Sequence, residues 1–336
     1  MRFYPLSQSP LYKLESRKKL AELLDLSRRE LELLANSGIG SYSFFDTKAK
    51  NGKKTRHVEH PHPPLRKVQR SLTRLLGRIE PPAYLHSAFR GRSYVTNASK
   101  HAYSERSAKI DIKSFFKAAD SSRVARAFRD QFECSGDVAA ILSKLTTILG
   151  HIPTGGNSST MISFWAYKPM FDEIYSLSFG ANVVMTCCVD DMTFTGEKVS
   201  RGFINSVRLI VRKFGLKTHK ERYFSKNTPK IITGVAVTSN GLRLPNARRR
   251  KLHDGFALVK TEPNLKERVK KAESLLGRAA EAQQVEPRFG AEVFLATKVL
   301  NETRAALRGS KRVIQLLCVL PNHGHIFAVN WVTLFG

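Results

Sequence analysis

The sequence predicts an α+β fold, because apolar residues recur with two different periods along one chain. Helical spacing is found in residues 13–35 and 65–79 and again beyond residue 245. Short β-branched runs alternate with helical segments between residues 108 and 244. Hydrophobic residues make up 42% of the 336 residues, so wholesale disorder is excluded. The length fits one elaborate domain or two to three small subdomains.

Two segments within the first hundred residues are predicted to be helical. Leucines recur at helical spacing over residues 13–35, where Ser27 and Glu30 have the spacing of a capping box. After a proline-rich segment, residues 65–79 form an amphipathic helix. The polar face of this helix carries five cations: Arg66, Lys67, Arg70, Arg74 and Arg78. Such a face is either solvated or follows a phosphate backbone.

The central strands carry three acidic residues. Asp111 lies near the end of an apolar strand at residues 108–112, and Asp190 and Asp191 interrupt a hairpin over residues 182–195. Adjacent like charges raise each other's proton affinity unless a cation neutralises them. Three carboxylates on neighbouring strand ends are typical of a site for two Mg²⁺ ions, with Mn²⁺ as a substitute. The alternative for Asp190-Asp191 alone is an ordinary turn pair.

The net charge of +28 is unevenly distributed. Residues 1–100 carry +12, residues 101–200 carry −1, and residues 201–336 carry +17. Two basic arms therefore flank a nearly neutral centre that contains the acids. A nucleic acid is the expected partner of so basic a chain. The alternatives are general solubility or a membrane-surface patch.

Other cofactors and compartments are not indicated. The four cysteines show no CxxC pair, and the histidines at residues 60–62 lie among prolines without an acidic cluster, so zinc is not expected. No apolar run reaches the roughly 18–20 residues of a membrane span, and no secretory leader is visible. We expect a cytoplasmic protein without a membrane partner.

Four segments resemble the motifs of reverse transcriptases, in the family's order. Residues 111–116 (DIKSFF) resemble the first catalytic motif, and residues 152–159 (IPTGGNSS) the L-P-Q-G-x-x-x-S loop. Residues 188–191 (CVDD) resemble the YADD box, and residues 215–220 (GLKTHK) the following lysine motif. Departures from the family pattern are Thr154, Thr160 and Cys188 in place of Gln, Pro and an aromatic residue.

Two further segments narrow the resemblance to bacterial retron reverse transcriptases. Residues 97–101 (NASKH) match the retron N-A-x-x-H box, and residues 232–234 (ITG) are close to its V-T-G triplet. The resemblance implies a right-hand polymerase fold. Its subdomains are an N-terminal helical segment (1–45), fingers (46–107, with 120–180 partly interleaved), a palm with an antiparallel sheet (108–244), and a helical thumb and C-terminal RNA-binding region (245–336).

The resemblance also implies roles for single residues. Asp111, Asp190 and Asp191, with the backbone carbonyl of Ile112, hold the two Mg²⁺ ions. The residues expected to bind the dNTP are Phe116 as a steric gate against a ribose 2′-OH, Gly155 as a point of close backbone approach, and Arg56 and Lys220 as triphosphate ligands. The alternatives are core packing for Phe116 and plain surface charge for Arg56 and Lys220.

RNA binding is expected of two groups. The first comprises Asn97 and His101, for which a capping Asn and a buried His are the alternatives. The second is the basic run Arg248, Arg249, Arg250 and Lys251, for which a solvated face is the alternative.

As retron enzymes do, the chain is expected to bind a cognate structured noncoding RNA and to prime from an RNA 2′-OH. It would then make branched multicopy DNA (msDNA), and work with a separate effector protein in antiphage defence. Rival functions are a catalytically weak RNA-binding scaffold, an intron-maturase or diversity-generating type of reverse transcriptase, and a palm-fold cyclic-dinucleotide synthase. The missing GG[DE]EF loop argues against the last of these.

Overall fold

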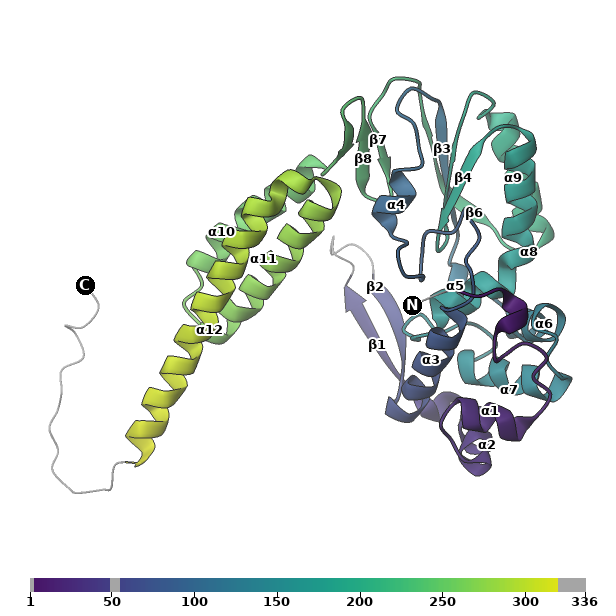
Figure 1. Ribbon diagram of the computed structural model, residues 1–336, viewed down its shortest axis with the longest axis horizontal. Coiled ribbons are helices and arrows are strands. Elements are labelled where there is room, and N and C mark those ends of the chain that lie inside the picture. Colours follow the sequence, from purple (N-terminus) through teal and green to yellow (C-terminus); the bar gives the residue numbers. More distant parts are fainter. Residues whose placement is uncertain (1–2, 49–54, 320–336) are drawn as a thin grey trace, which may run out of the picture. The chain divides into compact units, whose positions relative to one another are not determined.

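A computed structural model describes residues 3–48 and 55–319 of the chain (Figure 1). Contacts divide it into a first unit, Met1–Arg243, and a second unit that begins at Leu244. The boundary lies one residue before the predicted start of the C-terminal helical region.

The N-terminal part of the first unit is helical, as predicted. It contains α1 (Arg17–Leu23), α2 (Arg28–Asn36) and α3 (Pro63–Leu76), with the two-stranded antiparallel sheet β1 (Tyr42–Lys48) and β2 (Thr55–Pro61) between α2 and α3. The predicted capping box is confirmed, because Ser27 and Glu30 exchange hydrogen bonds of 2.7 and 3.2 Å. The segment that joins β1 to β2 lies outside the described residues.

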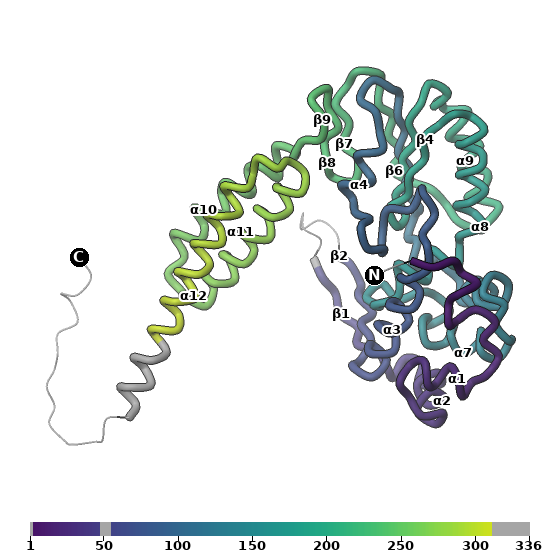
Figure 2. Tube along the Cα trace, viewed as in Figure 1, coloured from purple at the N-terminus to yellow at the C-terminus, as the bar shows by residue number. Residues whose placement is uncertain are grey.

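A four-stranded antiparallel sheet forms the centre of the unit, with strand order β4-β5-β3-β6. Its strands are β3 (Ser107–Ile112), β4 (Val184–Cys188), β5 (Asp191–Thr195) and β6 (Thr218–Phe224). The predicted hairpin over residues 182–195 is therefore confirmed as β4 and β5. Figure 2 shows how the chain reaches β4 only after the long helix α8, so that β3 meets its neighbours from distant sequence.

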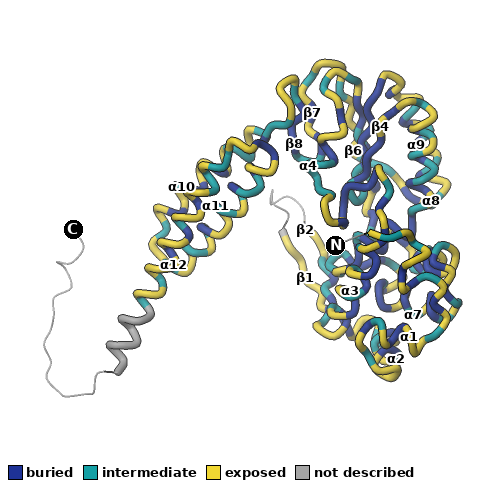
Figure 3. The backbone as a smooth tube through the Cα atoms, viewed as in Figure 1, coloured by how far each residue is buried: buried dark blue, intermediate teal, exposed yellow. Residues whose placement is uncertain are grey.

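The two faces of this sheet differ in polarity, because side chains alternate along each strand. Ile110, Met192 and Phe194 are buried on one face, where the ring of Phe194 packs 5.5 Å from that of Phe203 on α9. The opposite face carries buried hydroxyls, among them Thr193 and Thr195. Buried residues accordingly follow the strands in Figure 3, where they are dark blue.

Helices complete the first unit. They are α4 (Tyr94–Ala98), α5 (Phe115–Ala118), α6 (Ser121–Arg126), α7 (Gly136–Thr146), α8 (Ser159–Gly180) and α9 (Arg201–Lys213). The strand-like run predicted over residues 231–238 is corrected to two strands of a small sheet: β7 (Lys230–Ile232) and β8 (Val235–Thr238), followed by β9 (Gly241–Arg243). The turn at Thr233-Gly234 has positive φ at both residues, which reverses the chain there.

The second unit consists of three long helices: α10 (Asn246–Lys260), α11 (Leu265–Val285) and α12 (Gly290–Val319). Helix α11 packs against both others through a stripe that includes Ala272, Leu275, Ala279 and Ala282, all of which are fully buried. Small side chains on this stripe allow close helix packing. The predicted helical C-terminal region is confirmed as far as residue 319.

The α+β fold class is thus confirmed by the structure. Within the described residues, no helix combines the length and the apolar character needed to cross a membrane.

Candidate active site

A strained two-residue turn joins β4 to β5. Cys188 pairs with Asp191 across the hairpin, so the turn consists of Val189 and Asp190. Val189 adopts φ +65°, which is costly for a β-branched residue. Its N–H donates to Ser87 Oγ at 3.0 Å, and the carbonyl of Asp190 accepts from the Ile112 N–H at 3.0 Å. These bonds hold the turn against the end of β3. Of the two acids predicted to interrupt the hairpin, only Asp190 lies in the turn, since Asp191 is the first residue of β5.

Strand register brings the three acids to one end of the sheet. Asp111 on β3 lies opposite Asp191 on β5 and opposite His219 on β6. A register shift between Lys109 and Asp111 disturbs the pairing of β3 with β6 at this point. The turn adds Asp190 beside them. Carboxylates separated by 79 positions in sequence therefore become neighbours.

Two of these acids already have cationic partners from the protein. Asp111 Oδ1 contacts His219 Nε2, and its Oδ2 accepts from Lys220 Nζ at 3.3 Å. Asp191 Oδ2 is paired with Lys109 Nζ. Asp190 has no ion pair among the described residues. Over the same residues, no three His, Cys, Asp or Glu side chains are gathered in an arrangement ready to hold a metal ion.

The charges at this end of the sheet are incompletely compensated. Burial, together with the neighbouring Asp111 carboxylate, raises the pKa of Asp190 to about 6. Burial also raises the pKa of Asp191, against the opposing effect of Lys109. Asp191 Oδ1 is buried without a hydrogen-bond partner. Hard oxygen donors in this state fit a divalent cation.

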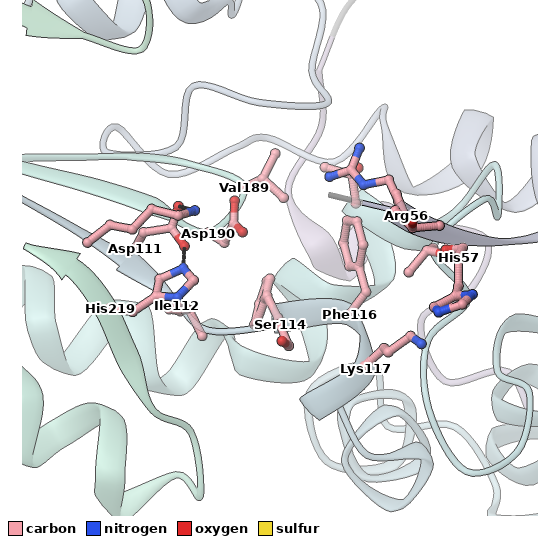
Figure 4. Close-up of a pocket in the computed structure, with 15 residues that line it drawn as sticks. Arg56, His57, Asp111, Ile112, Ser114, Phe116, Lys117, Val189, Asp190 and His219 are labelled. Atoms are coloured by element: carbon pink, nitrogen blue, oxygen red, sulfur yellow. Dashed lines mark hydrogen bonds and ion pairs between the residues drawn. The ribbon is translucent and has the colours of Figure 1, made fainter. Parts of the chain in front are cut away.

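A cavity of about 570 Å³ opens beside Asp111 and Asp190. It is lined by residues from β2, β3, β6, α5, α8 and the connecting loops: Thr55, Arg56, His57, Asp111, Ile112, Ser114, Phe115, Phe116, Lys117, Thr154, Thr160, Val189, Asp190, His219 and Lys220. Figure 4 shows Asp111 and Asp190 on one side of it, with Arg56 and Phe116 on the other. Six of the predicted site residues meet here; Asp191 and Gly155 are not among the lining residues.

Phe116 reaches the cavity because of the backbone just before it. Ser114 has φ +52°, which turns the chain out of β3 into the short helix α5. Phe115 then packs on Tyr167 at 5.5 Å between ring centroids, while Phe116 is only partly buried. The partial burial of Phe116 therefore favours a role in the cavity over the alternative of a core residue.

The packing of the loop on β2 requires glycine at position 155. A Cβ atom there would lie 2.7 Å from the Glu59 carbonyl oxygen and 2.8 Å from Val58 Cγ1, so the loop can pack on β2 only with glycine. Thr154 reinforces this contact, because its N–H donates to the Glu59 carboxylate at 3.0 Å and its hydroxyl to the His57 carbonyl at 2.8 Å. The departure at Thr154 thus joins the loop to β2. Close approach of a nucleotide to Gly155 stays a prediction.

Gly155→Ala is expected to destabilise the chain by about 1–3 kcal/mol, because β2 or the loop must move to relieve the overlap. Chemical denaturation of the two proteins measures this difference. Gly150→Ala is not a suitable control, since Gly150 has φ +80°, whereas Gly136→Ala meets open space and is expected to be neutral. Equal stability of Gly155→Ala and wild type would contradict the packing role.

Asn97 and His101 are both buried in the folded chain, and an RNA contact of either residue stays a prediction. Asn97 is fully buried, and its amide lies 3.4 Å from Thr233 Oγ1. His101 lies beyond the end of α4, with its ring nitrogens 2.8 and 2.7 Å from the hydroxyls of Thr195 and Thr186. The N-A-x-x-H box therefore connects the β7–β8 turn and the polar face of the central sheet.

The basic run on α10 divides into two pairs. Arg248 forms an ion pair with Glu281 at 2.5 Å, and Arg249 with Glu286 at 3.0 Å, so both join α10 to the α11 side of the second unit. Arg250 and Lys251 are exposed and have no acidic partner among the described residues. Phosphate contacts of the run stay a prediction, which the exposure of Arg250 and Lys251 favours most.

Three residues of the site were not predicted from the sequence. Lys109 lies two positions before Asp111 and therefore on the same face of β3, a signal that could have identified it. His219 is within the lysine motif, but its contact with Asp111 depends on strand register. Ser87, which holds the turn, has no local sequence signal.

An antiparallel sheet that ends in three carboxylates beside a cavity with several cations is typical of enzymes that transfer nucleotidyl groups with two metal ions. Comparisons with known proteins agree with this class. No protein-family model matches the chain. It is 25% identical over 255 residues to the retron Se72 reverse transcriptase of Salmonella heidelberg (strain 579083-10), covering 72% of this chain and 66% of that protein.

It is also 25% identical over 276 residues to the retron Mx162 reverse transcriptase of Myxococcus xanthus, covering 71% of this chain and 56% of that protein. The matches thus span just under two thirds and just over half of these relatives' lengths. A solved complex of the foamy viral protease-reverse transcriptase with double-stranded DNA matches 80% of this chain and 43% of that chain, with 15% identity and a TM-score of 0.45. The predicted resemblance to retron reverse transcriptases is confirmed by the two sequence relatives.

Proposed function

We propose that the chain is a retron-type reverse transcriptase, an RNA-directed DNA polymerase that acts by two-metal nucleotidyl transfer. The observation that supports this most directly is the meeting of Asp111, Asp190 and Asp191 at one end of the central sheet, beside the cavity that contains Phe116. The names of the two sequence relatives support the same class of enzyme.

The carboxylates of Asp111, Asp190 and Asp191, with the Ile112 carbonyl, would hold two Mg²⁺ ions, or Mn²⁺ in their place. When bound, the ions would lower the pKa of the attacking hydroxyl and stabilise the leaving pyrophosphate. The buried, unpartnered Asp191 Oδ1 and the lack of an ion pair at Asp190 support this assignment.

The cavity's own side chains would bind and orient the dNTP. Arg56 on β2 and Lys220 on β6 line it from different strands and would contact triphosphate oxygens. The ring of Phe116 would lie against the sugar and exclude a 2′-OH. His219 and Lys109 would hold the carboxylates in place before the ions arrive.

The finer parts of the proposal concern the partners. A cognate structured noncoding RNA is the expected template and primer, with synthesis starting from an RNA 2′-OH and ending in branched msDNA. Exposed Arg250 and Lys251 in the second unit would contact RNA phosphates. A separate effector protein and a cytoplasmic role in antiphage defence complete the proposal, on the resemblance to retrons alone.

The main alternative is an RNA-binding scaffold of the same fold with weak catalysis. The contacts of Lys109 and His219 with the carboxylates favour it, because these side chains occupy oxygens that metal ions need. An intron-maturase or diversity-generating enzyme has less support, since both sequence relatives are retron enzymes.

Co-expression with the genomic segment that flanks the gene tests the proposal. The co-purified nucleic acid is treated with RNase or DNase and analysed on denaturing gels. A short DNA covalently joined to RNA, absent from an Asp190→Ala/Asp191→Ala variant, is the expected result. Bound RNA without DNA, after dNTPs and Mg²⁺ are supplied, would instead support the scaffold.

Phe116→Val is expected to raise ribonucleotide incorporation relative to deoxyribonucleotide incorporation by about 10–200-fold, because a smaller side chain leaves room for the 2′-OH. Primer extension with each nucleotide type gives the two values of kcat/KM. Phe203→Val, which alters a ring on α9 against the apolar face of the sheet, is the control for general loosening. An unchanged ratio in Phe116→Val would remove Phe116 from the sugar site.

A further inference from the structure

The outer side of α3 is a second basic surface of the first unit, apart from the cavity. We call it the α3 basic face; it comprises Arg66, Lys67, Arg70 and Arg74 on the helix and Arg78 just beyond its end. The inner side of the same helix is fixed in the core, because Val68, Leu72 and Leu76 have no exposed area. The cations are therefore carried on a rigid support. None of them belongs to the cavity beside the acids.

The partners of these cations show which are available. Lys67 Nζ pairs with Asp25 at 2.6 Å, Arg66 lies 3.0 Å from His60 Nε2, and the Arg78 guanidinium lies over a tyrosine ring. Arg70 and Arg74 are exposed and have neither a hydrogen bond nor an ion pair with any described residue. They are therefore the two guanidinium groups of this face that are free to bind a ligand.

Arg66, Arg70 and Arg74 follow one another at four-residue intervals. Such neighbours lie about 5–6 Å apart at Cβ, and like charges at this spacing destabilise a helix unless acids alternate with them. Only Asp25 supplies an acid here, and it is taken by Lys67. The face also borders a hollow of about 460 Å³, lined by Asp25, Pro63, Arg66, Lys67, Arg70, Ser71 and Arg74. A ligand with regularly spaced negative charges would neutralise this row.

We propose that the α3 basic face binds the phosphate backbone of double-stranded RNA, with Arg70 and Arg74 contacting consecutive phosphates. The inference rests on the proposed function only for the choice of RNA as the polyanion. No aromatic side chain is among the described residues that line the hollow, so the hollow lacks the stacking platforms with which proteins bind single strands. Duplex RNA is instead recognised through its shape and phosphates.

The test uses the full-length chain with Asp190→Asn, so that polymerisation does not enter the measurement. Fluorescence anisotropy follows binding of a blunt RNA duplex of about 20 base pairs between 50 and 200 mM salt. The added Arg70→Ala/Arg74→Ala substitutions are expected to weaken binding and to lower the slope of log K against log salt by about 2. Between 50 and 200 mM salt, the variant is then expected to lose about tenfold less affinity than the chain with both arginines.

Arg201→Ala/Arg212→Ala is the matched control, because it removes two exposed arginines from α9 with the same change in net charge. Arg70→Lys/Arg74→Lys is expected to keep the wild-type slope. Equal effects of the α3 and α9 variants would overturn the proposal. So would an unchanged duplex affinity with a selective loss of binding to vesicles that contain phosphatidylserine, which would assign the face to a membrane.

These results separate the inference from the proposed function. A wild-type chain that incorporates no dNTP would contradict the polymerase, while an Arg70/Arg74-dependent salt slope would still support the α3 basic face. An active polymerase whose slope does not depend on these arginines would contradict only the face.

Discussion

Asp190→Asn is expected to lower dNTP incorporation by about 10³-fold or more while leaving the chain folded. The amide keeps the shape of the carboxylate but removes the charge that a metal ion requires. Burial already disfavours this charge, as the raised pKa of Asp190 indicates, so the neutral side chain is not expected to reduce thermal stability. Single-turnover primer extension and thermal unfolding measure the two effects.

Asp130→Asn is the control for the loss of one negative charge, because Asp130 is exposed and pairs only with the adjacent Arg129 among described residues. Its incorporation rate is expected to match wild type. If Asp190→Asn retained activity within tenfold of wild type, the carboxylate cluster would not be the catalytic centre, and the scaffold function would gain support.

The second expected result is a loss of stability in mild acid. Burial lowers the pKa of His101 to about 3 and that of His86 to about 4, so both rings are neutral in the folded chain. Lys230 and Arg92 add positive charge near them. In the unfolded chain both would protonate near pH 6.5. The contribution of the two neutral rings to the free energy of unfolding is therefore fully present above that pH. It falls as the pH drops toward 4, by about 2 kcal/mol for each ring at pH 5.

Denaturation midpoints between pH 7.5 and about 4.5 test this expectation. His101→Gln keeps an amide near Thr186 and Thr195 but cannot take up a proton, so its stability should depend less steeply on pH than that of wild type. His253→Gln changes an exposed histidine and should leave the slope unchanged. Parallel pH profiles for wild type and His101→Gln would contradict the prediction.

The local elements could be predicted from sequence where one period dominates. Residues 65–79 alternate apolar and basic positions at helical spacing, and α3 buries the predicted side. The hairpin at residues 182–195 was evident from its β-branched runs. The strand-like run at residues 231–238 was too short to reveal its central turn, which depends on positive φ at Thr233 and Gly234.

The site was predictable in its acids but not in their surroundings. Asp111, Asp190 and Asp191 belong to recognisable motifs, whereas their contacts with Lys109 and His219 arise from strand register across distant segments. The contacts of His101 could not be predicted for the same reason, because its partners lie on the distant strands β4 and β5. A sequence pattern indicated that the residue matters, but it did not distinguish an RNA contact from a buried connection between elements.

The side chains of Lys109 and Lys220 have a consequence for how the proposed site would take up a metal ion. Their positive charges offset part of the repulsion among the carboxylates before any metal ion binds. A divalent ion would compete with Lys109, Lys220 and the ring of His219 for oxygens of Asp111 and Asp191. Its apparent affinity would then be a difference between two binding energies, which substitution of the competing side chains would change without altering a metal ligand.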